Sequence, residues 1–258
     1  MHTITAVIQA RLGSTRLPGK TMLLMNGESL LGHLLKRIRK SKHIHAVIVA
    51  TTTEKKDDPI VEFAMEHGLK YYRGSEDDVL DRFYQTVGTF RLETIVRVTP
   101  DCPLLDPRVA DRVIEKYLSG SYDYVSNVLE PTYPDGFDTE VFSAGALAKA
   151  WREARLPSER EHVTAYIVKH PELFRLCNVR KDGEDLSSIR LTVDTRNDYE
   201  FISRVLEKLG MTDDIFHLED ILRVLKENPE LMDINRGIGR NEGYQLSLLK
   251  DGQHENNT

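Results

Sequence analysis

The chain has 258 residues, of which 40% are hydrophobic and 29% are charged, a composition typical of a globular protein with a sizeable core. No stretch approaches the roughly 18 consecutive apolar residues of a membrane span, and the formal net charge of −6 disfavours a nucleic-acid coat. The first residues do not resemble a secretory signal, and Cys102 and Cys177 are too few for a disulfide framework or a zinc site. We therefore expect a cytoplasmic protein with no membrane or nucleic-acid partner.

The first half of the chain alternates short apolar runs with amphipathic helical patterns. Strands are predicted at 4–10, 46–51, 69–73 and 94–99, and helices at 29–40, 59–67, 77–88 and 107–119. This alternation is typical of an α/β fold in which helices cover both faces of a mostly parallel sheet.

The pattern changes after residue 120. A short apolar run at 122–128 precedes the turn at 134–136 and the half-alternating segment 138–142, where we expect the sheet to change direction. Further helices are predicted at 143–155, 158–169, 197–208 and 218–227, and further strands at 173–180 and 189–193. No flexible linker interrupts these elements, so we predict one domain over 1–230. A C-terminal extension follows over 231–258, and we expect it to be frayed beyond Lys250.

The most informative loop directly follows the first predicted strand and consists of Ala10, Arg11, Leu12, Gly13, Ser14, Thr15, Arg16, Leu17, Pro18, Gly19 and Lys20. In open α/β sheets, ligands bind at this edge, beyond the carboxyl ends of the strands. The two glycines would let backbone amides approach a phosphate closely, and the three cations supply positive charge. The loop fits a triphosphate better than it fits the alternative, a solvated basic loop.

Two common phosphate-binding motifs are excluded. A Walker loop has four residues between its first glycine and the Gly-Lys pair, whereas five residues separate Gly13 from Gly19, and Pro18 lacks an amide donor. The Gly-x-Gly-x-x-Gly fingerprint of dinucleotide-binding folds is also absent from the sequence.

Two aspartates follow apolar runs at the same predicted edge of the sheet. Asp101 follows the strand at 94–99, and Asp194 follows the strand at 189–193. Because successive strand ends line one crevice, the two carboxylates can converge. Mg²⁺ prefers oxygen ligands, and nucleotide sites often use one or two carboxylates together with phosphates and water. We predict that Asp101 and Asp194 bind Mg²⁺, with helix capping as the alternative role of each.

The loop sequence IQARLGSTRLPGK closely resembles the first motif of the sugar-activating cytidylyltransferases, especially the group of spore-coat polysaccharide biosynthesis protein F. The resemblance covers almost the whole chain, through segments at 49–52, 74–83, 97–107, 134–143, 160–164, 191–202 and 240–244. It implies a GT-A-like (Rossmann-like) three-layer nucleotidyltransferase fold, CTP as donor and Mg²⁺ as the metal, carried by Asp101 and Asp194. It also implies a homodimer formed partly through a small inserted segment around residues 130–190.

The resemblance adds residues to the nucleotide site. The family often places an Asp-Arg pair near the nucleotide, which matches Asp81 and Arg82, although in a predicted helix these could form a surface ion pair. Thr51 and Thr99 lie at strand ends, where they would contribute to the pocket for the base or the ribose. The predicted nucleotide-binding set is thus Ala10, Arg11, Leu12, Gly13, Ser14, Lys20, Thr51, Asp81, Arg82 and Thr99.

Two further carboxylates are candidates for binding the acceptor, and the first of them, Asp138, could instead face a second metal. Asp138 and Glu140 alternate with apolar residues in a segment that matches a family motif, and their alternative is a solvent-facing side of a strand. We leave His162 out of the catalytic set because a histidine on an amphipathic helix is more often structural. Cys102 is left out because the reaction needs no covalent intermediate.

The predicted reaction is attack by an acceptor oxygen on the α-phosphorus of CTP, with pyrophosphate leaving in line. Catalysis would depend on positioning and charge neutralisation by Arg11, Arg16, Lys20 and Asp101. Two alternatives stay open, an enzyme of the same fold that uses another nucleotide or a nucleotide-sugar, and an inactive nucleotide-binding scaffold subunit. The acceptor stays open between a 2-keto sugar acid, a polyol phosphate, a sugar phosphate and a phosphonate.

Overall fold

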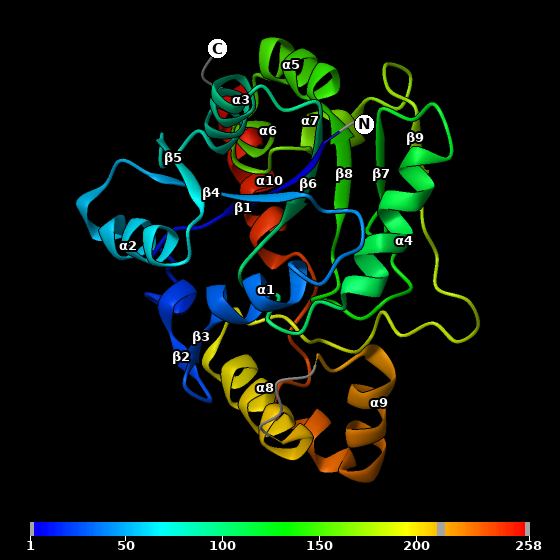
Figure 1. The fold of residues 1–258 in the computed structure, drawn as a ribbon. Coiled ribbons are helices and arrows are strands. Elements are labelled where there is room, and N and C mark those ends of the chain that lie inside the picture. Colours follow the sequence, from blue (N-terminus) through cyan, green and yellow to red (C-terminus); the bar gives the residue numbers. More distant parts are fainter. Residues whose placement is uncertain (1–2, 211–214, 256–258) are drawn as a thin grey trace.

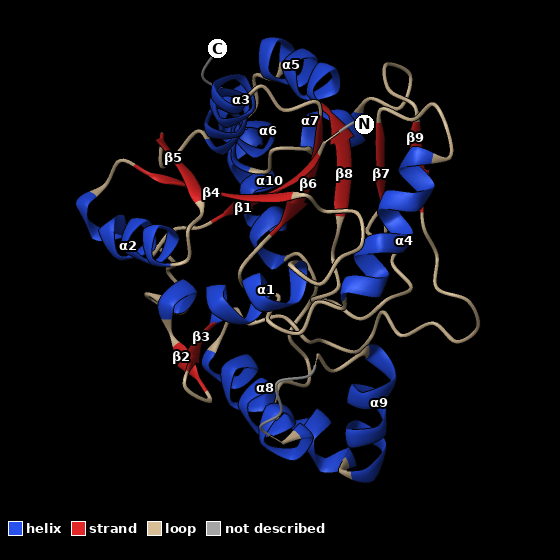
Figure 2. Ribbon diagram, viewed as in Figure 1, coloured by secondary structure: helices blue, strands red, loops and turns tan. Residues whose placement is uncertain are grey.

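The computed structural model describes residues 3–210 and 215–255, and a seven-stranded sheet forms the centre of this part of the chain (Figures 1 and 2). The strand order is β5-β4-β1-β6-β8-β7-β9. The bounds are β1 Ile4–Gln9, β4 Ala46–Thr52, β5 Lys70–Gly74, β6 Thr94–Val98, β7 Tyr124–Ser126, β8 Glu140–Ser143 and β9 Leu176–Asn178. A separate two-stranded hairpin joins β2 (Leu24–Met25) to β3 (Glu28–Ser29).

One strand of the sheet runs against the others. β5, β4, β1 and β6 pair in parallel, whereas β8 is antiparallel to both β6 and β7. The predicted change of direction near residue 140 is therefore confirmed, as is the mostly parallel α/β sheet. The register places Arg97 of β6 opposite Glu140 of β8, at the edge where β6 ends and β8 begins.

Helices cover both faces of the sheet, which gives three layers. One face packs against α1 (Leu30–Ile38), α2 (Asp58–Glu66) and α4 (Pro107–Leu118). The other face packs against α3 (Val79–Phe90), α5 (Ala144–Glu153) and α7 (Ala165–Lys169). Successive side chains of β1 point to opposite faces of the sheet, so Ile4, Ala6 and Ile8 enter the first core whereas Val7 enters the second.

A third apolar core lies apart from the sheet, at the bottom of Figure 1. It is formed mainly by α8 (Arg196–Leu209), α9 (Leu218–Glu227) and the 3-10 helix η3 (Pro229–Asp233). Leu191 and Val193 also belong to it. No helix in the described residues is both long enough and apolar enough to span a membrane.

The strand predicted at 189–193 is wrong. Among the described residues, this segment forms only an isolated bridge between Asp135 and Arg190, and its side chains of Leu191 and Val193 enter the third core. Gly136 permits the close approach, since its φ is +107° and a Cβ there would lie 2.6 Å from the carbonyl carbon of Leu191.

The helix predicted at 158–169 is interrupted. The structure has α6 (Pro157–Glu161) and α7 (Ala165–Lys169), joined by a turn in which Val163 has a φ of +41°. A β-branched residue rarely adopts this conformation, so packing must hold the turn in place. The side chain of Val163 is fully buried in the second core.

Two other predicted segments contain regular elements. The stretch around 130–190 supplies β8, β9 and α5 to α7 to the sheet and its second core. The C-terminal extension forms α10 (Glu242–Glu255), which packs against α6, where Asp251 accepts hydrogen bonds from Ser158. The helix thus continues past Lys250, where we expected fraying, as far as Glu255, and 256–258 lie outside the described residues.

Candidate active site

A cleft of about 1130 Å³ opens at the edge of the sheet where the parallel strands end. Its walls are the loop after β1, the turn after β6, the start of β8, the turn between α6 and α7, and the beginning of α10. The predicted site residues that line it are Arg11, Gly13, Ser14, Arg16, Lys20, Thr99, Asp101, Asp138, Glu140 and Asp194. Residues far apart in the sequence are therefore brought together as the strand-end argument requires.

Five predicted nucleotide-binding residues do not line this cleft, namely Ala10, Leu12, Thr51, Asp81 and Arg82. Asp81 in α3 accepts a hydrogen bond from the indole of Trp151 in α5, 2.8 Å away. Arg82 is 1% exposed and donates to the backbone oxygen of Ser75. Burial and the neighbouring charge of Arg11 lower the pKa of Arg82 to about 10. The two residues thus form neither a surface ion pair nor part of the cleft wall.

The loop after β1 is held in a compact curl by its own backbone. The oxygen of Leu12 accepts from the amides of Ser14 and Gly19, and the amide of Leu12 donates to Asp57 Oδ1 at 2.7 Å. Gly19 has a φ of +71°, which suits glycine and turns the chain into the short helix η1 (Lys20–Met22). Lys20 therefore points into the cleft from a fixed backbone.

Lys20 lies between the two predicted metal ligands. Its Nζ donates to Asp101 Oδ2 at 3.0 Å, to Asp194 Oδ1 at 2.7 Å and to the oxygen of Val193 at 3.1 Å. Burial disfavours the ammonium, but the two carboxylates outweigh it and raise the pKa of Lys20. Burial likewise opposes ionisation of Asp194, yet Lys20, Arg16 and Arg190 together lower its pKa. Asp194 is therefore arranged to remain ionised beside these cations.

Backbone contacts fix the distance between the two aspartates. The oxygen of Asp101 accepts from the amide of Val193 at 2.8 Å and from the hydroxyl of Thr192 at 3.0 Å. Within the described residues, no group of three or more His, Cys, Asp or Glu side chains could hold a metal ion. Two converging carboxylates nevertheless fit a hard cation whose other ligands are phosphate oxygens and water.

A hydrogen-bonded row of side chains forms the floor of the cleft across β1, β6, β8 and β7. Arg97 donates to Gln9 and to Glu140 Oε2, while Tyr124 and Thr164 donate to Glu140 Oε1. Both oxygens of Glu140 are thus engaged by the protein. Glu140 lines the cleft as predicted, but its hydrogen bonds indicate a structural role in the floor.

Asp138 faces the cleft beside a second carboxylate, Asp135. Arg240 Nη2 lies 2.5 Å from Asp138 Oδ1, and its Nε lies 3.9 Å from Asp135 Oδ1. Burial raises the pKa of Asp138 to about 7, and the charges of Asp135 and Glu140 add to the increase although Arg240 opposes it. The protonation of Asp138 therefore changes near neutral pH.

This shift predicts a pH effect on stability. A carboxyl group whose pKa is higher in the folded than in the unfolded protein binds its proton more tightly when folded, so its contribution to stability falls as the pH rises from about 4 to about 7. We expect the Asp138→Asn variant to gain stability relative to the parent chain over this window. Urea denaturation of both proteins at pH 5 and pH 8 measures it, and a pH-independent difference between the two would contradict the shift.

Sequence reasoning missed the contribution of the turn after α6 and of α10. His162 Nε2 lies 2.9 Å from the hydroxyl of Ser247, which also donates to Glu161, and all three residues line the cleft. Arg16 bridges Asp194 and Glu242, at 3.0 Å from each. Both segments lie in motifs of the resemblance, which was the signal that could have pointed to them.

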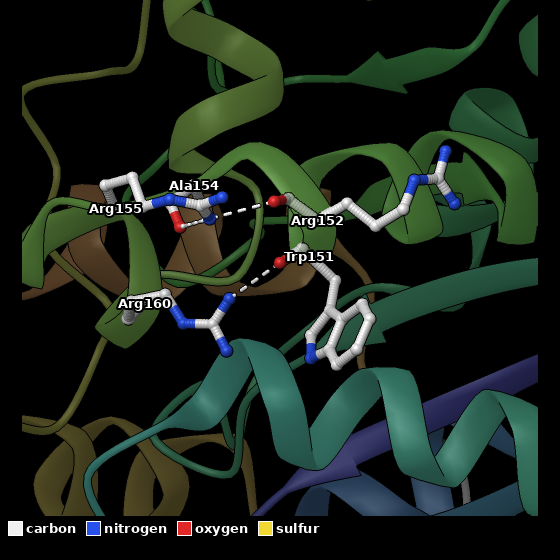
Figure 3. A pocket seen from close by; sticks show the side chains of 5 residues that line it. All are labelled: Trp151, Arg152, Ala154, Arg155 and Arg160. Carbon is white, nitrogen blue, oxygen red and sulfur yellow. Dashed lines mark hydrogen bonds between the residues drawn. The ribbon is translucent and has the colours of Figure 1, made fainter.

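A shallower hollow lies beside α5 and is lined by Trp151, Arg152, Ala154, Arg155 and Arg160 (Figure 3). Two of its three arginines are engaged by the protein: Arg155 donates to the backbone oxygens of Arg152 and Ala154, and Arg160 donates to that of Trp151. Arg160 also pairs with Asp78 in the wall of the main cleft. Arg160 therefore links the hollow to this wall.

Comparisons with known proteins agree on one family. The family model described as cytidylyltransferase matches residues 5–234. The spore coat polysaccharide biosynthesis protein SpsF of Bacillus subtilis is 34% identical over 238 residues, covering 89% of this chain and 97% of that protein. A 3-deoxy-manno-octulosonate cytidylyltransferase of Pelobacter propionicus is 32% identical over 116 residues, 45% of this chain and 44% of that one. The structure of a cytidylyltransferase from Leptospira borgpetersenii superposes with a TM-score of 0.86 at 34% identity, covering 93% of this chain and all of that one.

Proposed function

Because this chain belongs to the cytidylyltransferase family, we propose that its cleft transfers CMP from CTP to a sugar-like acceptor, with Asp101 and Asp194 holding a magnesium ion. The observation that carries the assignment is the convergence of both carboxylates on Lys20, next to the loop after β1. Such a site combines the negative charge that a metal requires with the positive charge that a triphosphate requires.

The side chains divide the work of the reaction. Arg11, Arg16 and Lys20 bind the triphosphate and stabilise the negative charge that develops on the departing pyrophosphate. Asp101 and Asp194 would hold the metal ion, which supplies charge neutralisation to phosphate oxygens when bound. The acceptor oxygen attacks the α-phosphorus directly, so no protein nucleophile takes part.

The acceptor occupies the end of the cleft formed by β8, β7 and α7. Asp138, Thr164 and His162 line this end together with apolar side chains of Val168 and Leu246. Polar groups beside an apolar wall are what a sugar-like molecule with hydroxyls and a carbon skeleton requires.

The proposal also covers the location, the oligomeric state and the pathway of the enzyme. By resemblance, the chain is a cytoplasmic homodimer that serves the biosynthesis of a surface polysaccharide. Leu173, in the segment 130–190, is 40% exposed and offers apolar area to a partner copy. Sedimentation velocity tests this interface, since a monomer at micromolar concentration would contradict it.

Pyrophosphate release tests the function. The protein is incubated with Mg²⁺ and each of the four ribonucleoside triphosphates, against a panel of acidic sugars, sugar phosphates and polyol phosphates. We expect release with CTP and one class of acceptor, and none when the metal is chelated. Equal release with another triphosphate would overturn the assignment of CTP. Release of a nucleoside diphosphate from a nucleotide-sugar, offered as donor in a parallel assay, would indicate a glycosyltransferase.

A further inference from the structure

Arg190 is a buried cation that binds three carboxylates at the wall of the cleft. The residue is 7% exposed. Its Nη1 lies 2.8 Å from Asp135 Oδ2, its Nη2 lies 2.9 Å from Asp194 Oδ2, and its Nε lies 2.9 Å from Asp198 Oδ1. Asp198 is fully buried, so this cluster is built into the protein rather than formed by mobile surface groups.

The two oxygens of the Asp194 carboxylate have different cationic partners. Oδ2 accepts from Arg190, whereas Oδ1 accepts from Lys20 at 2.7 Å and lies 3.0 Å from Arg16. Asp198 Oδ2 also accepts from the backbone amide of Asp194 at 3.1 Å. The side chain and the backbone of Asp194 are thus both held from behind, and Oδ1 is the oxygen turned toward the cations of the phosphate site.

We propose that Arg190 is a positioning residue that holds Asp194 so that Oδ1 faces the metal ion, and that fixes Asp135 of the acceptor side with the same guanidinium. The inference rests on the proposed metal role of Asp194. The residues around a metal ligand commonly set its orientation, and losing one typically costs about 10- to 100-fold in metal affinity or activity. Arg190 would thus connect Asp194 on the nucleotide side of the cleft to Asp135 on the acceptor side through one guanidinium.

The chemistry of the side chain supports this role. A guanidinium presents five donors in a rigid plane and can bind several carboxylates at once, which a single ammonium cannot do with the same geometry. Burial disfavours this cation, but the three aspartates outweigh it and raise its pKa. Buried ion clusters gain little stability over apolar packing, so orientation of the cleft carboxylates is the property that this cluster provides.

A second buried arginine provides a matched control. Arg37 is 4% exposed, and its guanidinium donates to the backbone oxygens of Pro103 and Phe216 rather than to carboxylates. Arg37 does not line the cleft. The Arg37→Lys variant therefore reports the general cost of changing a buried guanidinium, without disturbing Asp194.

The test measures how much a metal strengthens CTP binding. The dissociation constant of CTP is determined by calorimetry with Mn²⁺ and with EDTA, for the parent chain and for the variants Arg190→Lys, Arg37→Lys and Asp194→Asn. The metal effect is the dissociation constant in EDTA divided by that in Mn²⁺, and we expect Arg190→Lys to reduce this ratio by about 10-fold or more. The dissociation constant of Arg190→Lys in EDTA should stay close to that of the parent chain. Arg37→Lys should keep both the EDTA constant and the ratio of the parent chain.

The outcomes separate the inference from the function on which it rests. A loss of the metal effect in Asp194→Asn but not in folded Arg190→Lys would overturn the positioning role alone. An unchanged metal effect in Asp194→Asn would overturn the metal role of Asp194 itself. If Arg190→Lys does not fold, the Asp198→Asn variant replaces it. This variant keeps a side chain that can cap α8 but weakens the ion pair with Arg190. An unchanged ratio in Asp198→Asn would count against the positioning role of Arg190.

Discussion

The Asp101→Asn variant is expected to lose about 100- to 1000-fold in turnover while remaining folded. The substitution removes one of the two negative charges that converge on Lys20, and with it the proposed metal site. The fold should persist because the backbone oxygen of residue 101, which accepts from Val193 and Thr192, is unaffected.

Pyrophosphate release measures this effect, with the thermal unfolding midpoint recorded for the same preparation. Asp58→Asn is a suitable control, since Asp58 pairs with Arg73 at 2.7 Å and lies outside the cleft. Activity in Asp101→Asn equal to that of the control would remove Asp101 from the mechanism.

The Lys20→Met variant is expected to show two opposite effects. Turnover should fall by about 100- to 1000-fold, because the cation that stabilises the departing pyrophosphate is lost. The affinity of the free protein for divalent cations should rise, by about 10-fold or more, because Asp101 and Asp194 lose the ammonium that lies between them. A mutation that merely damaged the site would lower both quantities.

Electron paramagnetic resonance of unbound Mn²⁺ measures the affinity without CTP, so it does not depend on activity. Lys56→Met is the matched control, because Lys56 pairs with Glu76 at 2.6 Å near the same loop but does not line the cleft. Unchanged Mn²⁺ affinity in Lys20→Met would show that the two carboxylates do not form a metal site in the protein.

The sequence was most informative where a single element carries its own pattern. Short apolar runs located β1, β4, β5 and β6, and helical periodicity located the helices between them, because both patterns depend on neighbours in the chain. Glycines and cations directly after β1 likewise identified the loop, since its place at a strand end follows from the alternation itself.

Asp194 shows the limit of such reasoning. Its prediction depended on a strand at 189–193 that the protein does not form, yet it lies beside Lys20 and in the same cleft as Asp101. The segment reaches this place because Thr192 and Val193 bond to the backbone oxygen of Asp101, a contact between distant residues that has no periodic pattern.

The sequence by itself therefore determined the layers of the fold and the place of the loop after β1, both of which follow from local order along the chain. Only the tertiary structure decided how these groups are held. Arg190, the hydrogen bonds of Glu140 and the contacts of α10 with the cleft join residues from separate elements. Buried ion pairs and hydrogen bonds between such residues are selected by the packed three-dimensional arrangement, so composition and spacing do not reveal them.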